Sequence, residues 1–467
     1  MAEKIKKEKV KKKKDNTKKQ EAQLLKKQLK QQAKAREKEL SRIHNIEMSA
    51  LRENWYKLDN AALIYPAIGS SQFTSVFRIS AELKNDVNPE VLQQTLEQTI
   101  KRFPIFNVSL ANGLFWHYFQ PLTKPHIIEE EKNYPCRPFV LNKNNAIFRV
   151  LYYKNKISFE TFHSLTDGGG ASQFFNCLLA TYLKNMGVKI PETPEILNIR
   201  DKALEEEGED AFKIYADKNQ QASRKEKKAY FVKDPVNPMS VLQLIKGSAS
   251  VGQVKQVAKS YDATINELLS AVYILAMLNN KKRYKRNNNP IKLSVPVNLR
   301  RHFPSKTLKN FSAVFNIELP VEQENAGFEK ILELVKQQSA AIDKDYLLKF
   351  ISTNVKSERN FFVRAMPLVV KDFALRIAYS FVGESLFTST ISNLGVMKLP
   401  QEIENELLSY YVSIGATKVN RFNLAVVSHG DTIEMCFSNR LKSTAIMRDF
   451  FSFLSGLGID IVIESNF

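Results

Sequence analysis

The stretch FETFHSLTDGGG, residues 159–170, restricts the fold of this chain more than any other part of the sequence. Glycine loses more backbone entropy on folding than other residues, so a run of three needs a structural reason. Before the glycines, KISFETFH alternates in the manner of a β-strand that would end at His163. After them, apolar side chains over residues 171–185 recur at helical spacing. The sequence therefore predicts a strand, a sharp turn and a helix, with His163 at the mouth of a cleft.

This motif alone leaves the role of His163 open. An H-x-x-x-D pair arises readily by chance, and a glycine-rich loop beside a structural histidine would explain it. A phosphate cradle is disfavoured, because the stretch contains no G-x-G-x-x-G and no Gly-Lys-Ser/Thr sequence. Backbone N–H groups at the start of the helix would attract an anion, but Asp167 would repel it.

The positive charge of the chain is concentrated at its beginning. The 467 residues carry a formal charge of +20, and residues 1–50 hold 17 Lys and Arg against 7 Asp and Glu. Apolar residues are too sparse here for a packed core, so we expect a basic low-complexity arm, partly disordered and partly helical. The arm would be either a solubilising tail or a weak contact with RNA or an anionic membrane.

Cysteine content and hydropathy indicate a reducing compartment. Cys136, Cys177 and Cys436 are too few and too scattered for a disulfide framework or a zinc site, and we expect no metal. No apolar stretch follows the lysine-rich start, as a secretory signal would require. The longest apolar run, residues 268–278, is too short to span a bilayer. We therefore expect a cytoplasmic protein.

Helical and strand patterns alternate on both sides of a charged connector, residues 191–238. Residues 51–190 include a helix that begins after Asn88 and a hairpin through Asn112-Gly113. Residues 239–467 again mix long apolar helices with β-branched strands. This mixture predicts an α/β (α+β) chain with an N-terminal lobe, 51–190, and a C-terminal lobe, 239–467.

Together these features resemble the chloramphenicol acetyltransferase-like superfamily, which includes condensation domains, plant BAHD acyltransferases and alcohol O-acetyltransferases. Its signature, H-x-x-x-D-G at a strand-to-helix turn, appears here as HSLTDG. The segments FRISAEL, RFPIFNVSL, SVPVNLRRHFPSKTLKNF and TSTISNLG are similar to the bacterial alcohol-acetyltransferase-like branch. The resemblance covers roughly residues 52–467. It implies two similar lobes, arranged as a pseudo-dimer around a central tunnel.

The resemblance assigns roles to the charged residues of the turn. His163 would be the general base that takes a proton from the acceptor during attack on a thioester carbonyl. Imidazole suits this role because its pKa lies near neutrality. Asp167 would point away from the substrate and fix the turn by pairing with Arg300, or alternatively with Arg301.

Two further sets of residues would shape the tunnel. Gly168 and Gly169 would keep its approach clear. Ser389, Ser392 and Asn393 of TSTISNLG would lie on its floor, where a hydroxyl or an amide would stabilise a developing oxyanion. An ordinary strand and turn explains these three residues equally well.

The resemblance implies an acyltransferase that moves an acetyl or another short acyl group from acyl-CoA to a small alcohol or amine. Acyl-CoA, such as acetyl-CoA, would be a co-substrate, and no bound cofactor is expected. Phe162 stands where condensation domains carry a first histidine, and the DFGWG motif of BAHD enzymes is missing. Two alternatives remain: transfer from a carrier protein, as in natural-product or lipid tailoring, and a non-catalytic binding protein on this fold.

Overall fold

The computed structural model of the protein describes residues 55–69, 74–220, 226–237, 241–284, 288–417 and 420–467. Residues 56–120 and 126–467 form one unit, and residues 1–55 with 121–125 form another. The basic arm predicted for residues 1–50 lies outside the described residues. No helix among the described residues is long and apolar enough to cross a membrane.

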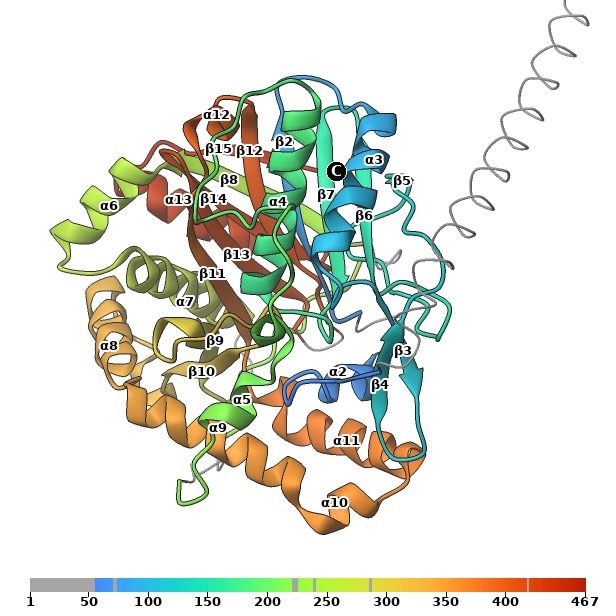
Figure 1. The fold of residues 1–467 in the computed structure, drawn as a ribbon. Helices are drawn as coiled ribbons and strands as arrows, with labels where there is room; N and C mark the ends of the chain where they lie inside the picture. The colour runs from blue at the N-terminus through green and yellow to red at the C-terminus, as the bar shows by residue number, and fades with distance from the viewer. Residues whose placement is uncertain (1–54, 70–73, 221–225, 238–240, 285–287, 418–419) are drawn as a thin grey trace, which may run out of the picture. The chain divides into compact units, whose positions relative to one another are not determined.

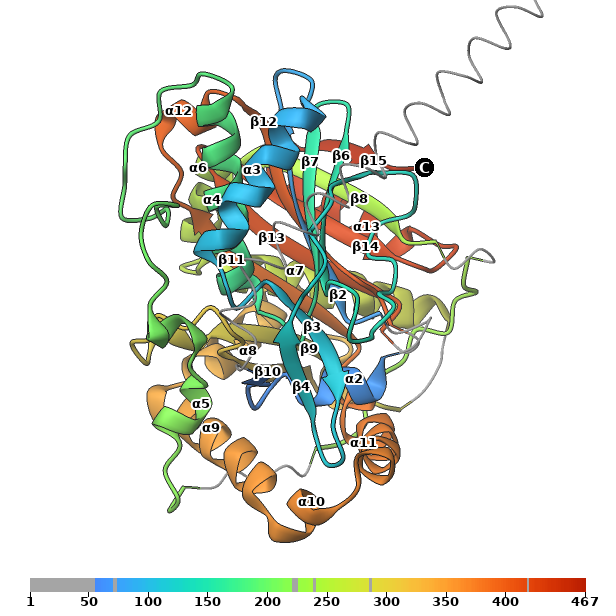
Figure 2. The ribbon, with the colours of Figure 1, turned by 45° about the vertical axis from the view of Figure 1, so that its right-hand side comes forward.

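The first large sheet carries the strand that leads to His163 (Figure 1). Its strands are β2 (Val76–Leu83), β5 (Glu129–Glu130), β6 (Phe148–Tyr153), β7 (Lys156–Phe162) and β12 (Leu407–Ile414). Two helices, α3 (Pro89–Arg102) and α4 (Gly168–Asn185), cover one of its faces. The order is β12-β2-β7-β6-β5, antiparallel except between β5 and β6. Figure 2 shows α3 and α4 side by side on one face of this sheet. Val76 pairs with Phe162 at the end of β7, so the ladder stops directly before His163.

Local sequence explains the start of α3 and the packing beneath α4. The Asn88 side chain accepts hydrogen bonds from the N–H groups of Glu90 and Val91 at 3.0 and 3.2 Å, which caps α3. The Phe174 ring stacks on Phe106 with 4.8 Å between ring centroids. Phe159 of β7 packs against both rings, at 4.9 Å from Phe174 and 6.4 Å from Phe106 between centroids, so one face of the strand contributes to an aromatic core.

The opposite face of β7 carries a buried carboxylate. Glu160 is 0% exposed and accepts hydrogen bonds from Arg78 Nε at 2.7 Å and from Arg149 Nε at 2.6 Å. The N–H of Cys136 donates to the same carboxylate at 2.6 Å. Burial would raise the pKa of Glu160, but the two guanidinium groups outweigh it and hold that pKa below its ordinary value.

The second large sheet is mixed and lies beside the first (Figure 1). It consists of β8 (Gln243–Ser250), β9 (Ile291–Asn298), β10 (Ser312–Leu319), β11 (Ser389–Met397), β13 (Phe422–His429), β14 (Thr432–Asn439) and β15 (Val462–Ser465). The order is β10-β9-β11-β13-β14-β8-β15, with β11 parallel to both of its neighbours. The helices that accompany it are α6 (Val251–Ser260), α7 (Ile265–Tyr284), α8 (Phe328–Ala340) and α13 (Ala445–Gly456). The apolar run 268–278 falls inside α7 and is mostly buried, as its composition predicts.

A small sheet and several short helices complete the described residues. The sheet has the order β1-β4-β3, with β1 at Tyr56–Lys57, β3 at Val108–Asn112 and β4 at His117–Pro121. The other α-helices are α2 (Ile64–Ile68), α5 (Ala211–Tyr215), α9 (Lys344–Arg359), α10 (Phe361–Ala365), α11 (Leu368–Val382) and α12 (Gln401–Glu404). The 3-10 turns are η1 (Glu205–Gly208), η2 (Leu299–Arg301), η3 (Val321–Gln323) and η4 (Glu384–Leu386).

One strand from late in the chain completes the first sheet. Strand β12 pairs antiparallel with β2, so that Tyr410 lies opposite Ala81 and Ile414 opposite Phe77. The mixed α/β class predicted from the sequence is confirmed by these sheets and helices. The predicted division into lobes at residues 190 and 239 stays a prediction. The pairing of β12 with β2 shows that residues 407–414 pack with the earlier half of the chain.

Candidate active site

The turn between β7 and α4 is tighter than the sequence indicates. Helix α4 begins at Gly168, and not after the glycines, because Asp167 is its N-cap. Asp167 Oδ1 accepts hydrogen bonds from the N–H groups of Gly169 and Gly170, both at 3.1 Å. The three glycines therefore form the first helical turn.

Close packing explains why these positions are glycine. A Cβ atom at Gly170 would lie 2.0 Å from the carbonyl oxygen of Leu308. A Cβ atom at Gly168 would lie 2.5 Å from Leu394 Cδ2, and one at Gly169 would lie 3.0 Å from Arg300 Nη1. The start of α4 thus packs directly against segments from the second half of the chain.

Asp167 also forms an ion pair across the chain. Its Oδ2 atom accepts hydrogen bonds from Arg300 Nη1 at 2.8 Å and from the N–H of Phe311 at 2.7 Å. Burial would raise the pKa of Asp167, which is 4% exposed, but the charge and hydrogen bonds of its partners lower it below the ordinary value. The carboxylate is consequently ionised and faces protein rather than an open cleft.

Arg300 is held in place by the loop that it belongs to. Its Nε donates to the carbonyl of Thr307 at 3.0 Å, and its Nη2 donates to the carbonyl of Lys309 at 2.6 Å. Arg301 is exposed and lies near Gly395 instead. Of the two arginines named from the sequence, Arg300 is the one beside Asp167.

His163 is enclosed by aromatic rings. Its imidazole stacks on Tyr65 with 4.5 Å between ring centroids and meets Phe77 edge-on at 5.0 Å. Its backbone N–H donates to the carbonyl of Ser75 at 2.8 Å. This burial lowers the pKa of His163 from 6.5, and the backbone of His163 itself, Asp167 and Asn310 only partly oppose the shift. The ring is therefore neutral at physiological pH.

Asn310 determines which ring nitrogen of His163 carries the proton. The Asn310 Nδ2 group donates to Asp59 Oδ2 at 3.0 Å and to the carbonyl of Ser164 at 3.4 Å, so its Oδ1 atom faces the imidazole. That oxygen lies 3.0 Å from His163 Nδ1 and can only accept. In the neutral ring, Nδ1 then holds the hydrogen and Nε2 holds the lone pair. Among the described residues, Nε2 has no hydrogen-bond partner.

Asp59 anchors this arrangement from the start of the described chain. It is 0% exposed and accepts hydrogen bonds from the N–H of Ala62 at 2.8 Å and from the N–H of Asn310 at 3.3 Å. Burial, with the nearby charge of Asp210, raises the pKa of Asp59 to about 7.

Sequence patterns missed Asp59, Tyr65 and Asn310. Only Asn310 had a signal, since it lies in the segment SVPVNLRRHFPSKTLKNF.

The three residues of β11 that the sequence suggests for the tunnel floor differ in burial and in hydrogen bonding. Ser389 is 0% exposed, donates to the carbonyl of Phe422 at 2.7 Å and lies 2.6 Å from the hydroxyl of Tyr273. Its hydroxyl hydrogen is thus already engaged. Ser392 and Asn393 are half-buried, and Asn393 Oδ1 accepts from the N–H of Gly395 at 2.8 Å. Within the part of the chain that the structure describes, no hydrogen bond joins these three residues to the turn.

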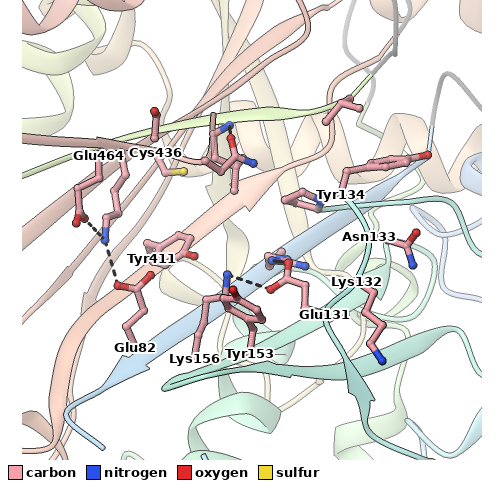
Figure 3. Close-up of a pocket in the computed structure, with 17 residues that line it drawn as sticks. Glu82, Glu131, Lys132, Asn133, Tyr134, Tyr153, Lys156, Tyr411, Cys436 and Glu464 are labelled. Carbon is pink, nitrogen blue, oxygen red and sulfur yellow. Dashed lines mark hydrogen bonds and ion pairs between the residues drawn. The ribbon is translucent and has the colours of Figure 1, made fainter. Parts of the chain in front are cut away.

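A cavity of about 690 Å³ lies elsewhere, lined by Glu82 and Tyr411 of the first large sheet and by Lys246 and Glu464 of the second (Figure 3). Lys246 bridges two carboxylates there, at 2.9 Å from Glu464 and 3.6 Å from Glu82. Figure 3 also shows Lys156 directed toward Glu131, and their charged atoms are 3.0 Å apart. None of the predicted site residues lines this cavity.

The cysteines are all reduced and buried. Burial raises the pKa of the Cys177 thiol to about 12, which disfavours a nucleophilic role. Among the described residues, no group of His, Cys, Asp or Glu could hold a metal ion.

Comparisons with known proteins bear on the fold. No protein-family model and no curated protein matches the sequence. The TRI101 protein of F. sporotrichioides, solved with coenzyme A and T-2, is 11% identical over 87% of this chain and 99% of its own, with a TM-score of 0.57. The first condensation domain of the CDA synthetase is 10% identical over 87% and 96%, with a TM-score of 0.54. The wax ester synthase/diacylglycerol acyltransferase from Marinobacter aquaeolei VT8 is 12% identical over 86% and 98%, with a TM-score of 0.50.

The chain therefore has the two-lobed fold of these three proteins, which confirms the fold that the resemblance implies. Identities near one residue in ten show the fold alone, so membership of the superfamily and the branch within it stay predictions.

The packing of α4 predicts a steric cost at Gly170. Gly170→Ala should lower the free energy of unfolding by ~1–3 kcal/mol, because the new methyl group meets a backbone carbonyl that has little room to move. Gly456→Ala, in the last turn of α13, is the matched control, since no neighbouring atom lies within 4 Å of its Cβ position. Chemical denaturation of both variants measures the difference, and equal stabilities would contradict this packing.

The Asp167–Arg300 pair predicts non-additive effects on stability. Asp167→Asn and Arg300→Ala should each cost about 3–5 kcal/mol, because each leaves a buried partner unpaired. The double variant should cost less than the sum of the two. The contribution of the ionised Asp167 to the free energy of unfolding should be complete above the ordinary Asp pKa of 3.8. It should be lost as the pH falls through the lowered pKa of Asp167. Thermal unfolding against pH tests both points, and strictly additive losses would mean that the residues act independently.

Proposed function

We propose that this protein is an acyltransferase in which His163 Nε2 is the general base. The acyl donor is a coenzyme A thioester, and the acceptor is a small alcohol or amine. The observation that carries the proposal is the fixed tautomer of His163: Asn310 Oδ1 accepts from Nδ1, which leaves the lone pair on Nε2. The solved TRI101 structure contains coenzyme A, which supports this class of donor for the shared fold.

The proposed reaction transfers one proton to His163 and back, and one acyl group from the thioester to the acceptor. The acceptor gives its O–H or N–H proton to His163 Nε2 while its oxygen or nitrogen attacks the thioester carbonyl carbon. The C–S bond then breaks, and the departing thiolate takes the proton back from the imidazolium. No acyl-enzyme forms, so no activated Ser or Cys is required. A low pKa keeps the imidazole neutral and ready to accept the proton at the start of each cycle.

The negative oxygen that develops on the thioester carbonyl needs a donor. Ser392 and Asn393 are the remaining candidates on β11, since the hydroxyl hydrogen of Ser389 is used by the carbonyl of Phe422. Asp167 and Arg300 would act as positioning residues that hold the turn. The intact pair favours an enzyme over the alternative of a non-catalytic binding protein on this fold, which would have no need to keep the turn in place.

Transfer from a carrier protein is the second candidate function. The likeness to a condensation domain of the CDA synthetase supports this alternative donor. Incubating the protein with free acyl-CoA of different chain lengths, while release of the thiol is followed, separates the two donors. Turnover with free acyl-CoA supports the first proposal, and turnover only with a phosphopantetheinylated carrier supports the second.

Removal of the base predicts a large loss of rate. His163→Ala should stay folded and lose ~10²–10⁴-fold in kcat/KM, the range for a positioned proton transfer. In the unaltered enzyme, kcat/KM should fall as the pH drops through a pKa below 6.5, because protonation removes the base. A pH–rate profile with its acid limb above 6.5, or near-normal turnover in His163→Ala, would exclude this mechanism.

Asn310 should affect the rate as a positioning residue. Asn310→Ala should lower kcat by ~10–10²-fold with little change in KM, because the imidazole loses the partner that fixes its tautomer. Since the hydrogen bond that His163 donates to Asn310 raises the pKa of His163, the acid limb should also move to lower pH. Asn176→Ala is the control, because Asn176 is a buried amide that bonds Tyr410 on another part of the sheet. An equal loss of kcat in both variants would point to general destabilisation.

A further inference from the structure

Helix α11 is amphipathic, but its apolar side faces outward. Two of its charged residues face the protein: Lys371 is 4% exposed, and the side chain of Asp372 is 22% exposed. Its apolar residues face outward, with Val369 82% exposed and Phe373 65% exposed. A helix on a water-facing surface has the opposite arrangement, so the outer face of α11 is suited to an apolar medium.

The hairpin between β3 and β4 accounts for the inward charges of α11. Lys371 Nζ donates to the carbonyl of Phe115 at 2.8 Å and lies 3.3 Å from the centre of the Trp116 ring. The imidazole of His117 lies 3.2 Å from the Asp372 carboxylate. These contacts fasten the hairpin tip, with Leu114 73% exposed, to the side of α11. Figures 1 and 2 both show the tip of this hairpin beside α11.

Helix α10 extends the same surface. Phe361 and Phe362 are 75% and 78% exposed, and only Met366 and Pro367 separate α10 from α11. The N–H of Leu368 donates to the carbonyl of Leu114 at 2.9 Å, which joins the hairpin to the start of α11. We call this surface the apolar platform; its members are Leu114, Phe115, Phe361, Phe362, Val369, Val370 and Phe373.

The charge around the apolar platform is positive. Residues 356–376 contain five cationic residues against the two acids Glu358 and Asp372. Both acids are paired within the protein, Glu358 with Lys213 at 2.7 Å and Asp372 with His117. Arg364, in contrast, is exposed on α10 between the phenylalanines and α11. Aromatic and aliphatic side chains with a basic rim are the composition of surfaces that lie in the interface of an anionic membrane.

We propose that the apolar platform docks this protein on the surface of an anionic lipid bilayer. The phenylalanines and valines enter the boundary between headgroups and acyl chains, and the exposed Arg364 contacts lipid phosphates. The outward phenylalanines, the cations around them and the inward acids fit a lipid surface better than a protein partner in water. The proposal stands apart from the acyltransferase assignment, because none of its residues belongs to the proposed active site.

Flotation of the full-length protein with lipid vesicles tests the proposal. The vesicles are phosphatidylcholine alone and phosphatidylcholine mixed with phosphatidylglycerol. At ~0.5 M salt, where the Debye length falls to about 4 Å, electrostatic attraction by the arm at residues 1–50 is screened. The unaltered protein should still bind the mixed vesicles, because insertion of apolar side chains does not depend on salt.

Two double variants make the test specific. Phe362→Glu with Phe373→Glu should lower the partition constant at high salt by ~10²-fold, about tenfold for each phenylalanine withdrawn from lipid. Val140→Glu with Val462→Glu is the matched control, since these valines are 72% and 67% exposed but lie outside the apolar platform. The control should bind as the unaltered protein does. All four substitutions are at exposed positions, and unchanged thermal unfolding verifies that each variant is folded.

Three results would overturn the proposal. Equal vesicle binding by the two double variants would place any membrane contact elsewhere. Complete loss of binding by the unaltered protein at high salt would assign the contact to electrostatics alone. A dimer in sedimentation that Phe362→Glu with Phe373→Glu dissociates, without vesicle binding, would show that a second copy covers the apolar platform.

Discussion

The carboxylate of Asp167 is the interaction on which the rest of the site depends. One oxygen caps the first turn of α4, and the other binds the Arg300 guanidinium and the backbone N–H of Phe311. These partners come from both halves of the chain, so a single buried charge joins them at one point. Removal of such a charge leaves several polar groups without partners, which is why a network of this kind has one stable arrangement.

The chemistry of His163 follows from that junction. Because Phe311 is bound to Asp167, the preceding residue, Asn310, is brought to the imidazole. The amide of Asn310 cannot turn over without losing its contact with Asp59, so it presents its oxygen to Nδ1. The side chain that would accept the proton is thus oriented by residues that lie far apart in sequence, and its burial keeps the imidazole uncharged.

Much of the local structure could be predicted from the sequence. Alternation in KISFETFH, the cap at Asn88 and the Asn112-Gly113 turn correspond to β7, α3 and the β3–β4 hairpin. These signals work because they depend on neighbours within a few positions, where backbone geometry fixes which side chains share a face. Composition also indicated the mixed α/β class, and the H-x-x-x-D-G motif together with the segment that contains Arg300 indicated the superfamily.

Other features were decided only by the tertiary structure. The need for glycine at the start of α4 arises from the close approach of Leu308 and Arg300, and the pairing of Asn310 with Asp59 spans 251 positions of the chain. The helix α11 has an ordinary apolar composition, but only its docking on the β3–β4 hairpin turns the charged side inward and the apolar side outward. Sequence patterns report spacing along one element, whereas these features depend on which distant element lies opposite, and that is set by the packing of the whole chain.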